Sequence, residues 1–312
     1  MPNSKPHTIK KYISPLYMDK LRGRMLVLPK QKTTTKTDFL IVYGLNSTIE
    51  KWSSLAYELR KYGNVTMPDL PGMGGMQSFY KLEEYPTIDN YADYLAAFIK
   101  LKFRRKKIVI IGMSFGFVVV TRMLQKYPDI VQKVELLFNV SGFSHNQDMK
   151  ISNRKKKQLR VYSYTFSHIT SSKLYRSVAF DEAMFPLIFK RGDKNYKEMS
   201  PIEKRKVLKN DIKIYKKNDT RTHMFVLNQL VKLDNTKIKI DLPVWNLVSE
   251  NDEYLSNENV RKNLELIYKK SRDIKLKKTR HQVSPYNMTE EFIADLMPYK
   301  LKSLLNRQNN KK

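Results

Sequence analysis

Residues 108–116 place the tightest constraint on the fold of this chain. They read Ile-Val-Ile-Ile-Gly-Met-Ser-Phe-Gly, an apolar run that enters the pattern G-x-S-x-G, and a helix-like segment follows to about Tyr127. The unbroken apolar run predicts a strand at Lys107–Ile111 that is buried on both faces, as in a parallel sheet. A serine between such a strand and a helix lies on a sharp, strained turn.

Glycine is needed on both sides of Ser114, because side chains two residues away would collide across the turn. Gly112 and Gly116 meet this requirement. The helix after Ser114 also directs amide donors and the positive end of its dipole at the reacting centre. We therefore predict that Ser114 is a nucleophile on a strand-to-helix elbow and that the Phe115 N–H is an oxyanion donor. The alternative is an ordinary structural turn.

Short apolar runs alternate with longer helix-like segments in both parts of the chain that flank a central region. This alternation is typical of a mostly parallel sheet flanked by helices, so the sequence predicts the α/β class. The predicted strands are Met25–Pro29, Phe39–Tyr43, Asn64–Met67, Val134–Val140, Leu242–Val248 and a weak strand at Ile274–Leu276. The predicted helices are Ile49–Lys61, a segment from Thr87 or Asp89 to Phe98, Asn257–Lys269 and Glu290–Leu305.

The central region differs in composition, since it is rich in lysine, arginine and aromatic residues and shows no clear alternation. Its aromatic residues either cover a pocket as a lid or form a small core of their own, and both alternatives are open. They are Tyr164, Phe166, Tyr175, Phe180, Phe185 and Phe189. We predict one folding unit with an N-terminal extension (1–23), a first core part (24–144), a cap or lid insertion (145–240), a second core part (241–306) and a basic tail (307–312).

Two further motifs make the chain resemble the α/β-hydrolases, and the resemblance as a whole covers both sides of the insertion. Residues 39–45 read Phe-Leu-Ile-Val-Tyr-Gly-Leu, and residues 69–74 read Asp-Leu-Pro-Gly-Met-Gly. The resemblance implies an α/β-hydrolase fold with a helical cap, and it makes the backbone N–H of Leu45 the second oxyanion donor. The chain departs from the family at Tyr43, where histidine is usual, and at Met76, where serine is common.

The resemblance also implies the partners of the serine. A serine hydroxyl needs a base to take its proton and an acid to orient that base, and in α/β-hydrolases both follow the serine along the chain. Asp252, after the strand Leu242–Val248, is the expected acid, and His281, after the last strand, is the expected base. Arg280 precedes this histidine where the family often has glycine.

Other side chains compete for these two roles. Glu250 and Glu253 are carboxylates close to Asp252 in the sequence. The other histidines lie before the fold or in and beside the insertion: His7, His145, His168 and His223. No metal or organic cofactor is required for a mechanism of this kind.

Composition limits the possible partners and the compartment. The formal net charge of +29 is large enough to attract phosphate or anionic lipid at low salt. The excess lysine is spread along the chain without a recognised nucleic-acid motif, so we expect no specific nucleic acid partner, whereas peripheral contact with an anionic membrane is open. The chain has no cysteine, which fits a cytoplasmic setting, and neither a usual export signal nor a membrane span is expected.

The sequence thus predicts a serine hydrolase that acts on a small-molecule carboxylic ester with an apolar acyl or alkyl group, and a lipid-like group is one open alternative. Amides, thioesters and carbon–carbon bonds are further substrates that this fold accommodates. Two alternatives belong to other classes: an inactive binding protein on the same scaffold, and a basic protein that associates with nucleic acid. The oligomeric state is open.

Overall fold

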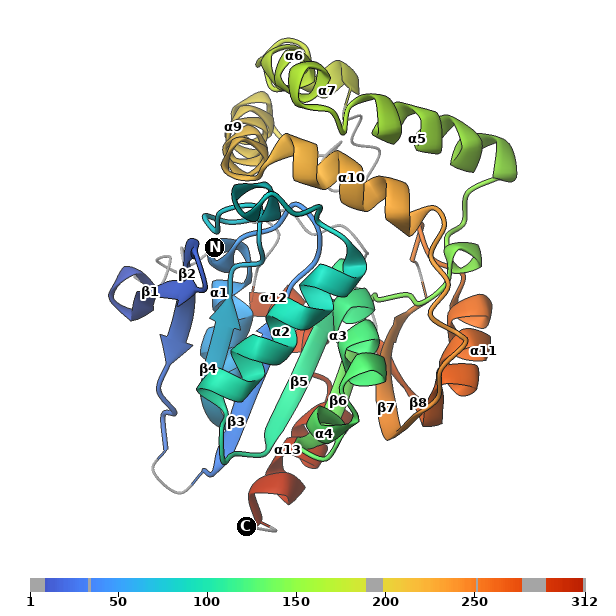
Figure 1. The fold of residues 1–312 in the computed structure, drawn as a ribbon. Helices are drawn as coiled ribbons and strands as arrows, with labels where there is room; N and C mark the ends of the chain where they lie inside the picture. The colour runs from blue at the N-terminus through green and yellow to red at the C-terminus, as the bar shows by residue number, and fades with distance from the viewer. Residues whose placement is uncertain (1–8, 33–34, 189–198, 251, 277–289, 311–312) are drawn as a thin grey trace.

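The computed structural model describes residues 9–32, 35–188, 199–250, 252–276 and 290–310. An eight-stranded sheet forms its centre, in the order β1-β2-β4-β3-β5-β6-β7-β8 (Figure 1). The strands are β1 (Ile13–Met18), β2 (Leu21–Leu28), β3 (Thr37–Val42), β4 (Gly63–Pro68), β5 (Ile108–Met113), β6 (Val134–Val140), β7 (Ile240–Ser249) and β8 (Tyr268–Leu276). All pairs from β4 to β8 are parallel, and β2 pairs antiparallel with both β1 and β4. The predicted α/β class with a mostly parallel sheet is confirmed.

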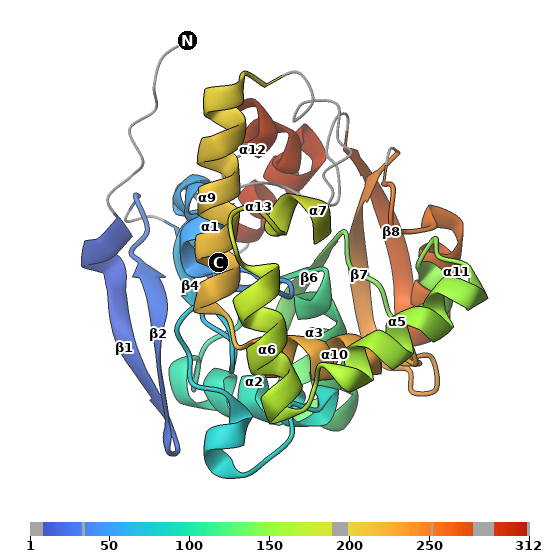
Figure 2. The ribbon, with the colours of Figure 1, turned by 90° about the horizontal axis from the view of Figure 1, so that it is seen from above.

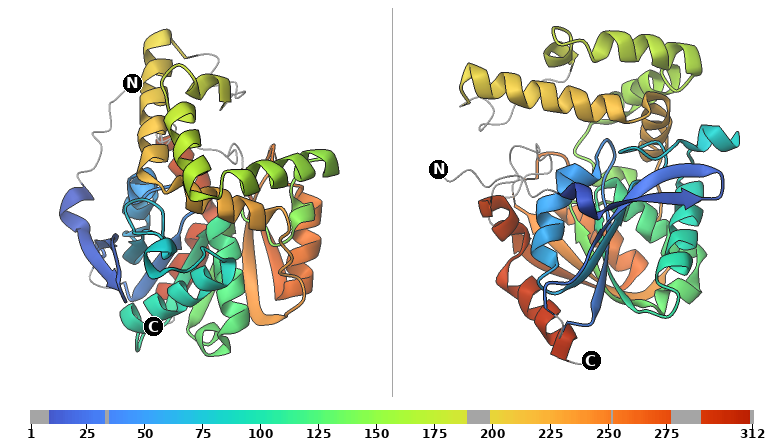
Figure 3. Two further views of the ribbon diagram at one scale, coloured as in Figure 1. Left: turned by 45° about the horizontal axis from the view of Figure 1, so that its top comes forward. Right: turned by 90° about the vertical axis from the view of Figure 1, so that its left-hand side faces the viewer.

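Helices cover both faces of this sheet. On one face lie α1 (Ile49–Leu59), α12 (Glu290–Leu296) and α13 (Tyr299–Asn310), and on the other lie α2 (Ile88–Lys102) and α3 (Phe115–Lys126) (Figure 3). The short α4 (Pro128–Val131) follows α3, and α11 (Asn257–Ile267) lies beside β8 (Figure 1). Because both faces are covered, every residue of β3 and β5 is buried, as the apolar run at residues 108–111 predicts.

Local signals set where these helices begin. The side chain of Thr48 accepts a hydrogen bond from the Lys51 amide at the start of α1, and Thr87 accepts one from the Asn90 amide at the start of α2. Threonine is a favoured N-cap because its oxygen satisfies an amide that has no partner within the helix. Of the two caps predicted for α2, Thr87 is the observed one.

The N-terminal part of the chain differs from the prediction. Residues 1–23 were expected to form an extension outside the core, but Ile13–Met18 is β1, an edge strand of the sheet, and β2 begins at Leu21. Before β1 lies a short 3-10 helix, η1 (Ile9–Tyr12). An edge strand with exposed Pro15 and Tyr17 gives a weak strand signal, because only one of its edges pairs with another strand and little of its surface is buried.

In the described part of the chain between β6 and β7, five α-helices stand above the sheet: α5 (Asn153–Thr165), α6 (Ile169–Ala179), α7 (Phe185–Ile188), α9 (Pro201–Lys217) and α10 (Thr220–Leu230) (Figures 1 and 2). They form the helical cap of the predicted fold. Tyr175, Phe180 and Phe185 are buried in a second apolar cluster of their own, while Tyr164 is exposed. Phe189 lies outside the described residues. The cap therefore has its own small core, one of the two alternatives for its aromatic residues.

The C-terminal elements are longer or shorter than predicted. α11 ends at Ile267, and the strand expected only at Ile274–Leu276 begins at Tyr268. Lysines at the exposed positions of this edge strand hide its alternation from a reading based on apolar runs. The single terminal helix predicted at Glu290–Leu305 is divided into α12 and α13 around Pro298, and α13 continues to Asn310, into the predicted basic tail.

In the described part of the chain, no helix has both the length and the apolar character that crossing a membrane requires.

Candidate active site

Ser114 lies on a strained turn between β5 and α3. Its backbone angles are φ 48° and ψ −120°, a conformation that side-chain-bearing residues rarely adopt. A Cβ on Gly116 would lie 2.1 Å from the Val42 carbonyl oxygen, and one on Gly112 would lie 2.8 Å from the Phe117 Cα. Both glycines are therefore required for the close packing of this turn, as the sequence predicts.

The turn after β3 lies directly against Ser114. A Cβ on Gly44 would lie 3.0 Å from the Ser114 Cβ and 3.6 Å from its Oγ. This contact brings the segment that carries Leu45 beside the serine, while Phe115 begins α3 on the other side. The two predicted oxyanion donors thus belong to the two segments that flank the Ser114 hydroxyl.

The end of β6 fixes the other side of the elbow. The Ser114 amide donates to the Val140 carbonyl at 3.1 Å. Two residues later in the chain, the Gly142 amide donates to the Asn139 Oδ1 at 2.8 Å, and the Asn139 Nδ2 donates to the Asn246 Oδ1 on β7 at 2.9 Å. Buried amide side chains that satisfy one another in this way hold the strand ends in one arrangement.

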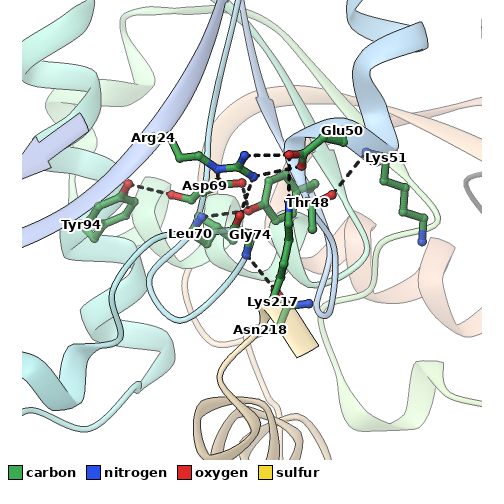
Figure 4. Close-up of polar contacts among 11 residues, drawn as sticks. Arg24, Thr48, Glu50, Lys51, Asp69, Leu70, Gly74, Tyr94, Lys217 and Asn218 are labelled. Carbon is green, nitrogen blue, oxygen red and sulfur yellow. Dashed lines mark hydrogen bonds and ion pairs between the residues drawn. The ribbon is translucent and has the colours of Figure 1, made fainter. Parts of the chain in front are cut away.

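Tyr43, which stands where the family usually has histidine, links the turn after β3 to the loop after β4. Its hydroxyl donates to the Asp69 Oδ1 at 2.6 Å and accepts from the Leu70 amide at 3.2 Å. The Asp69 Oδ2 accepts from the Arg24 Nε at 2.7 Å (Figure 4). The replacement of histidine by tyrosine therefore keeps a hydrogen-bonded connection at this position.

The Arg24 guanidinium extends this network towards α1 and the cap. Besides its bond to Asp69, it donates two hydrogen bonds to Glu50, at 2.7 and 3.0 Å, and one to the Gly74 carbonyl (Figure 4). Glu50 also accepts from Lys217 of α9 at 3.0 Å, and the Gly74 amide donates to the Asn218 Oδ1 at 2.8 Å. Strand β2, helix α1 and the last residues before α10 are thus joined through one arginine.

Burial and charge shift the acidic groups of this network in opposite directions. Burial raises the pKa of Asp69 to about 6, with the charge of Arg24 opposing this rise. Burial also raises the pKa of the Tyr43 hydroxyl well above its usual value. For Glu50, burial acts in the same upward direction, but hydrogen bonds from Arg24 and Lys217 outweigh it and lower the pKa to about 2.

Asp252 lies in the turn after β7, at the same sheet edge as Ser114, because β5 and β7 run parallel. It is 4% exposed, and its Oδ1 accepts from the Tyr254 and Leu255 amides, both at 2.9 Å. Of the competing carboxylates, Glu250 is ion-paired with Lys275 and Glu253 is exposed. The buried, amide-bound position distinguishes Asp252 from both.

The predicted base, His281, lies outside the described residues, as does His7. Strand β8, which pairs parallel with β7, ends at Leu276, at the same edge of the sheet as Asp252. His145 caps the 3-10 helix η3 (Asn146–Asp148), and His168 is exposed beside Tyr164. Neither contact connects these two histidines with Ser114.

His223 is the histidine whose position the sequence does not indicate. It lies on α10 of the cap, and its Nε2 is 3.5 Å from the Nδ2 of Asn46, the residue after Leu45. Burial lowers the pKa of this imidazole to about 4, so it is neutral at pH 7. A pocket between cap and core is lined by Asn46, Thr220, His223 and aromatic side chains.

Sequence reasoning missed these cap contacts, and also Arg24, because no local pattern marks them. Arg24 is 45 positions from Asp69, and Asn46 is 177 positions from His223. Within the described ranges, no group of three or more histidine, aspartate or glutamate side chains could hold a metal ion.

Comparison with known proteins agrees with this geometry. A family model described as "alpha/beta hydrolase fold" matches residues 39–283, a range that includes Ser114, Asp252 and His281. A search of curated proteins finds no match.

Solved structures show the same fold at low sequence identity. A lipase described as putative from Acinetobacter baumannii AYE has a TM-score of 0.68 and 19% identity, over 96% of this chain and 92% of that chain. A thermophilic esterase from Thermogutta terrifontis has a TM-score of 0.63 and 16% identity, over 95% and 97% of the two chains. An enol-lactonase from Burkholderia xenovorans LB400 has a TM-score of 0.64 and 12% identity, over 93% and 100%.

Proposed function

The chain belongs to the α/β-hydrolase fold family, and from this premise we propose that it is a serine hydrolase. Ser114 attacks the carbonyl carbon of the substrate, and His281 takes the hydroxyl proton and later returns it to the leaving group. Asp252 orients the imidazole and stabilises its positive charge. A water molecule, activated by the same imidazole, then releases the acyl group from Ser114.

The backbone at Ser114 is the observation that carries this proposal. A φ of 48° at a serine costs free energy, and a fold keeps such strain where the resulting position of the side chain has a use. The turn that carries Leu45 lies against this serine through Gly44, and the amides of Leu45 and Phe115 are the proposed oxyanion donors. The buried Asp252 at the same sheet edge supports the choice of acid.

Carboxylic esters with an apolar acyl or alkyl group are the substrates that we propose. Of the three structural neighbours named above, one is described as an esterase, one as a putative lipase and one as an enol-lactonase. The substrates that these names imply differ, but in each of them an acyl carbon is bonded to an ester oxygen. The aromatic side chains that the cap contributes to the pocket, including Tyr175 and Phe180, fit an apolar substituent.

Labelling with a fluorophosphonate tests the nucleophile directly. We expect the wild type to be labelled and Ser114→Ala to remain unlabelled, while the control Ser177→Ala, a change on the cap helix α6, labels like the wild type. On p-nitrophenyl esters of increasing chain length, Ser114→Ala and His281→Ala should each lose about 10³-fold or more of kcat. A folded wild type that takes no label and hydrolyses none of the esters would instead favour a binding protein on this scaffold.

A further inference from the structure

A small pocket separates the cap from the turn that follows β3. Its walls are the aromatic rings of Tyr175, Phe180 and Tyr215, and its polar lining includes Asn46, Thr220 and His223. The empty space measures about 230 Å³, part of it open to solvent, and its enclosed part accommodates a group about as large as one water molecule. Asn46 follows Leu45, a proposed oxyanion donor, so one wall of this pocket belongs to the turn that lies against Ser114.

Two buried polar atoms at this pocket lack partners. Among the residues that the structure describes, the His223 Nδ1 and the Thr220 Oγ1 form no hydrogen bond. Thr220 lines the pocket and is only 6% exposed. Buried polar atoms without partners are rare in folded proteins because they lose their hydrogen bonds to water without replacement.

The two atoms belong to one face of a single helix. Thr220 and His223 are three positions apart at the start of α10, a spacing that places side chains next to each other. The other ring nitrogen of His223, Nε2, lies 3.5 Å from the Asn46 Nδ2, so the ring also contacts the core. Cap and core together therefore orient the imidazole.

The chemistry of this pair favours an uncharged ligand. The imidazole is neutral at pH 7, since burial lowers its pKa, and the threonine hydroxyl carries no charge. The cation of Lys217 is held by Glu50 at 3.0 Å. A hydroxyl or carbonyl oxygen meets such a neutral pair without the desolvation cost of a charged group.

We propose that His223 and Thr220 form a specificity site for an uncharged hydroxyl or carbonyl oxygen on the substrate, a few bonds from the carbonyl carbon that Ser114 attacks. This proposal rests on the proposed hydrolase function and adds a polar group to its otherwise apolar substrate. Sites that hydrogen-bond a substrate hydroxyl discriminate strongly against analogues without it, because the buried partners are then left unpaired.

Two p-nitrophenyl esters of equal size test the site. In 3-hydroxybutyrate a hydroxyl stands where 3-methylbutyrate has a methyl group. We expect the wild type to prefer the hydroxy ester in kcat/KM by about tenfold or more, the effect of one buried hydrogen bond. In His223→Phe and in the nearly isosteric Thr220→Val, the ratio of the two kcat/KM values should fall towards one. The control His168→Phe, the same exchange at an exposed cap histidine, should keep the wild-type ratio.

The outcomes separate this proposal from the proposed hydrolase function. A wild type that takes the fluorophosphonate label but shows no preference between the esters refutes the polar site and leaves the hydrolase standing. If no label is taken, binding decides: NMR titration of the wild type with methyl 3-hydroxybutyrate and methyl 3-methylbutyrate, followed at the His223 ring, should show tighter binding of the hydroxy ester. Equal binding of the two would mean that the pocket holds only water and would overturn the proposal.

Discussion

At the scale of single residues, Tyr43 shows how a departure from the family pattern is accommodated. A phenol is longer than an imidazole, and its hydroxyl reaches the fully buried Asp69 at 2.6 Å and the Leu70 amide at 3.2 Å. Tyr43 precedes Gly44, whose backbone packs against Ser114. The position of the turn beside the serine therefore depends on a hydroxyl that also holds the loop after β4.

Tyr43→Phe removes only this hydroxyl. It leaves the Asp69 Oδ1 and the Leu70 amide without this partner in a buried region, which should lower the free energy of unfolding by about 1–3 kcal/mol. Because the turn beside Ser114 loses its connection, we expect kcat to fall more than KM changes. Denaturant unfolding and ester hydrolysis measure the two effects. Tyr17→Phe, at a residue 63% exposed, is the control, and equal behaviour of the two variants would contradict a role for Tyr43.

The partly buried imidazole of His223 makes stability depend on pH. Its pKa is about 4 in the folded protein and about 6.5 in the unfolded chain, so between these values the unfolded chain binds more protons. The contribution of His223 therefore rises as pH increases from about 4 to about 6.5, by at most about 1.4 kcal/mol per pH unit. Asp69 acts in the opposite direction up to about pH 6, because its pKa is raised by burial.

The comparison of wild type with His223→Gln isolates the histidine, since Asp69 is common to both. Urea unfolding at several pH values should show that the wild type gains stability relative to the variant as pH rises through this window. A difference that does not change with pH would mean that the imidazole is not held neutral.

At the scale of elements, the junction between α9 and α10 docks the cap onto the core. The Gly74 amide donates to the Asn218 Oδ1, and the Asp219 amide donates to the Gly72 carbonyl, both at 2.8 Å. Asn218 is 2% exposed. Gly72 and Gly74 both have positive φ, which directs these backbone groups towards the cap. The glycine-rich loop after β4 thus binds the residues at which α10 begins.

Asn218→Ala should loosen this junction more than Lys217→Met. The asparagine makes a buried hydrogen bond, and its loss should cost about 1–3 kcal/mol. The neighbouring Lys217–Glu50 ion pair has side chains 38% and 39% exposed, and its loss should cost less than about 1 kcal/mol. Thermal unfolding and the rate of proteolysis in the cap measure the difference, and the reverse order of the two variants would contradict this docking.

At the scale of the whole molecule, the net charge of +29 is unfavourable for a compact fold. Carboxylates neutralise part of this charge locally, since Glu50 forms ion pairs with Arg24 and Lys217. Most of the described lysines lie at the surface. Repulsion between such surface charges acts over a Debye length, about 10 Å at 0.1 M salt.

Added salt should therefore stabilise the protein. We expect Tm in scanning calorimetry to rise between about 0.02 and 0.3 M sodium chloride and then to level off as screening becomes complete. Sucrose at equal osmolality provides the control for effects unrelated to charge. A Tm that falls over this range would show that attractive ion pairs dominate the surface electrostatics.

The sequence by itself determined the α/β class of this protein and the turn that carries Ser114. The apolar run before Gly112, the glycines around Ser114 and the order in which Asp252 and His281 follow are local or sequential features, so the α/β class and the elbow could be predicted from them. Steric exclusion at a turn acts between near neighbours along the chain, and the buried strands need only a continuous apolar run. Of the two edge strands, β1 was missed and β8 was only partly predicted. An edge strand is exposed over much of its surface, so its hydrophobic pattern in the sequence is weaker.

Only the tertiary structure decided which distant side chains meet. Three such pairs are far apart in the sequence, and no spacing along the chain predicts them: Arg24 with Asp69, Asn46 with His223, and Asn218 with Gly74. Their contacts depend on how the cap folds over the sheet, which is decided by packing and by the need to satisfy buried polar groups. These interactions have no period along the chain, whereas the steric rules of a turn do have a fixed local spacing.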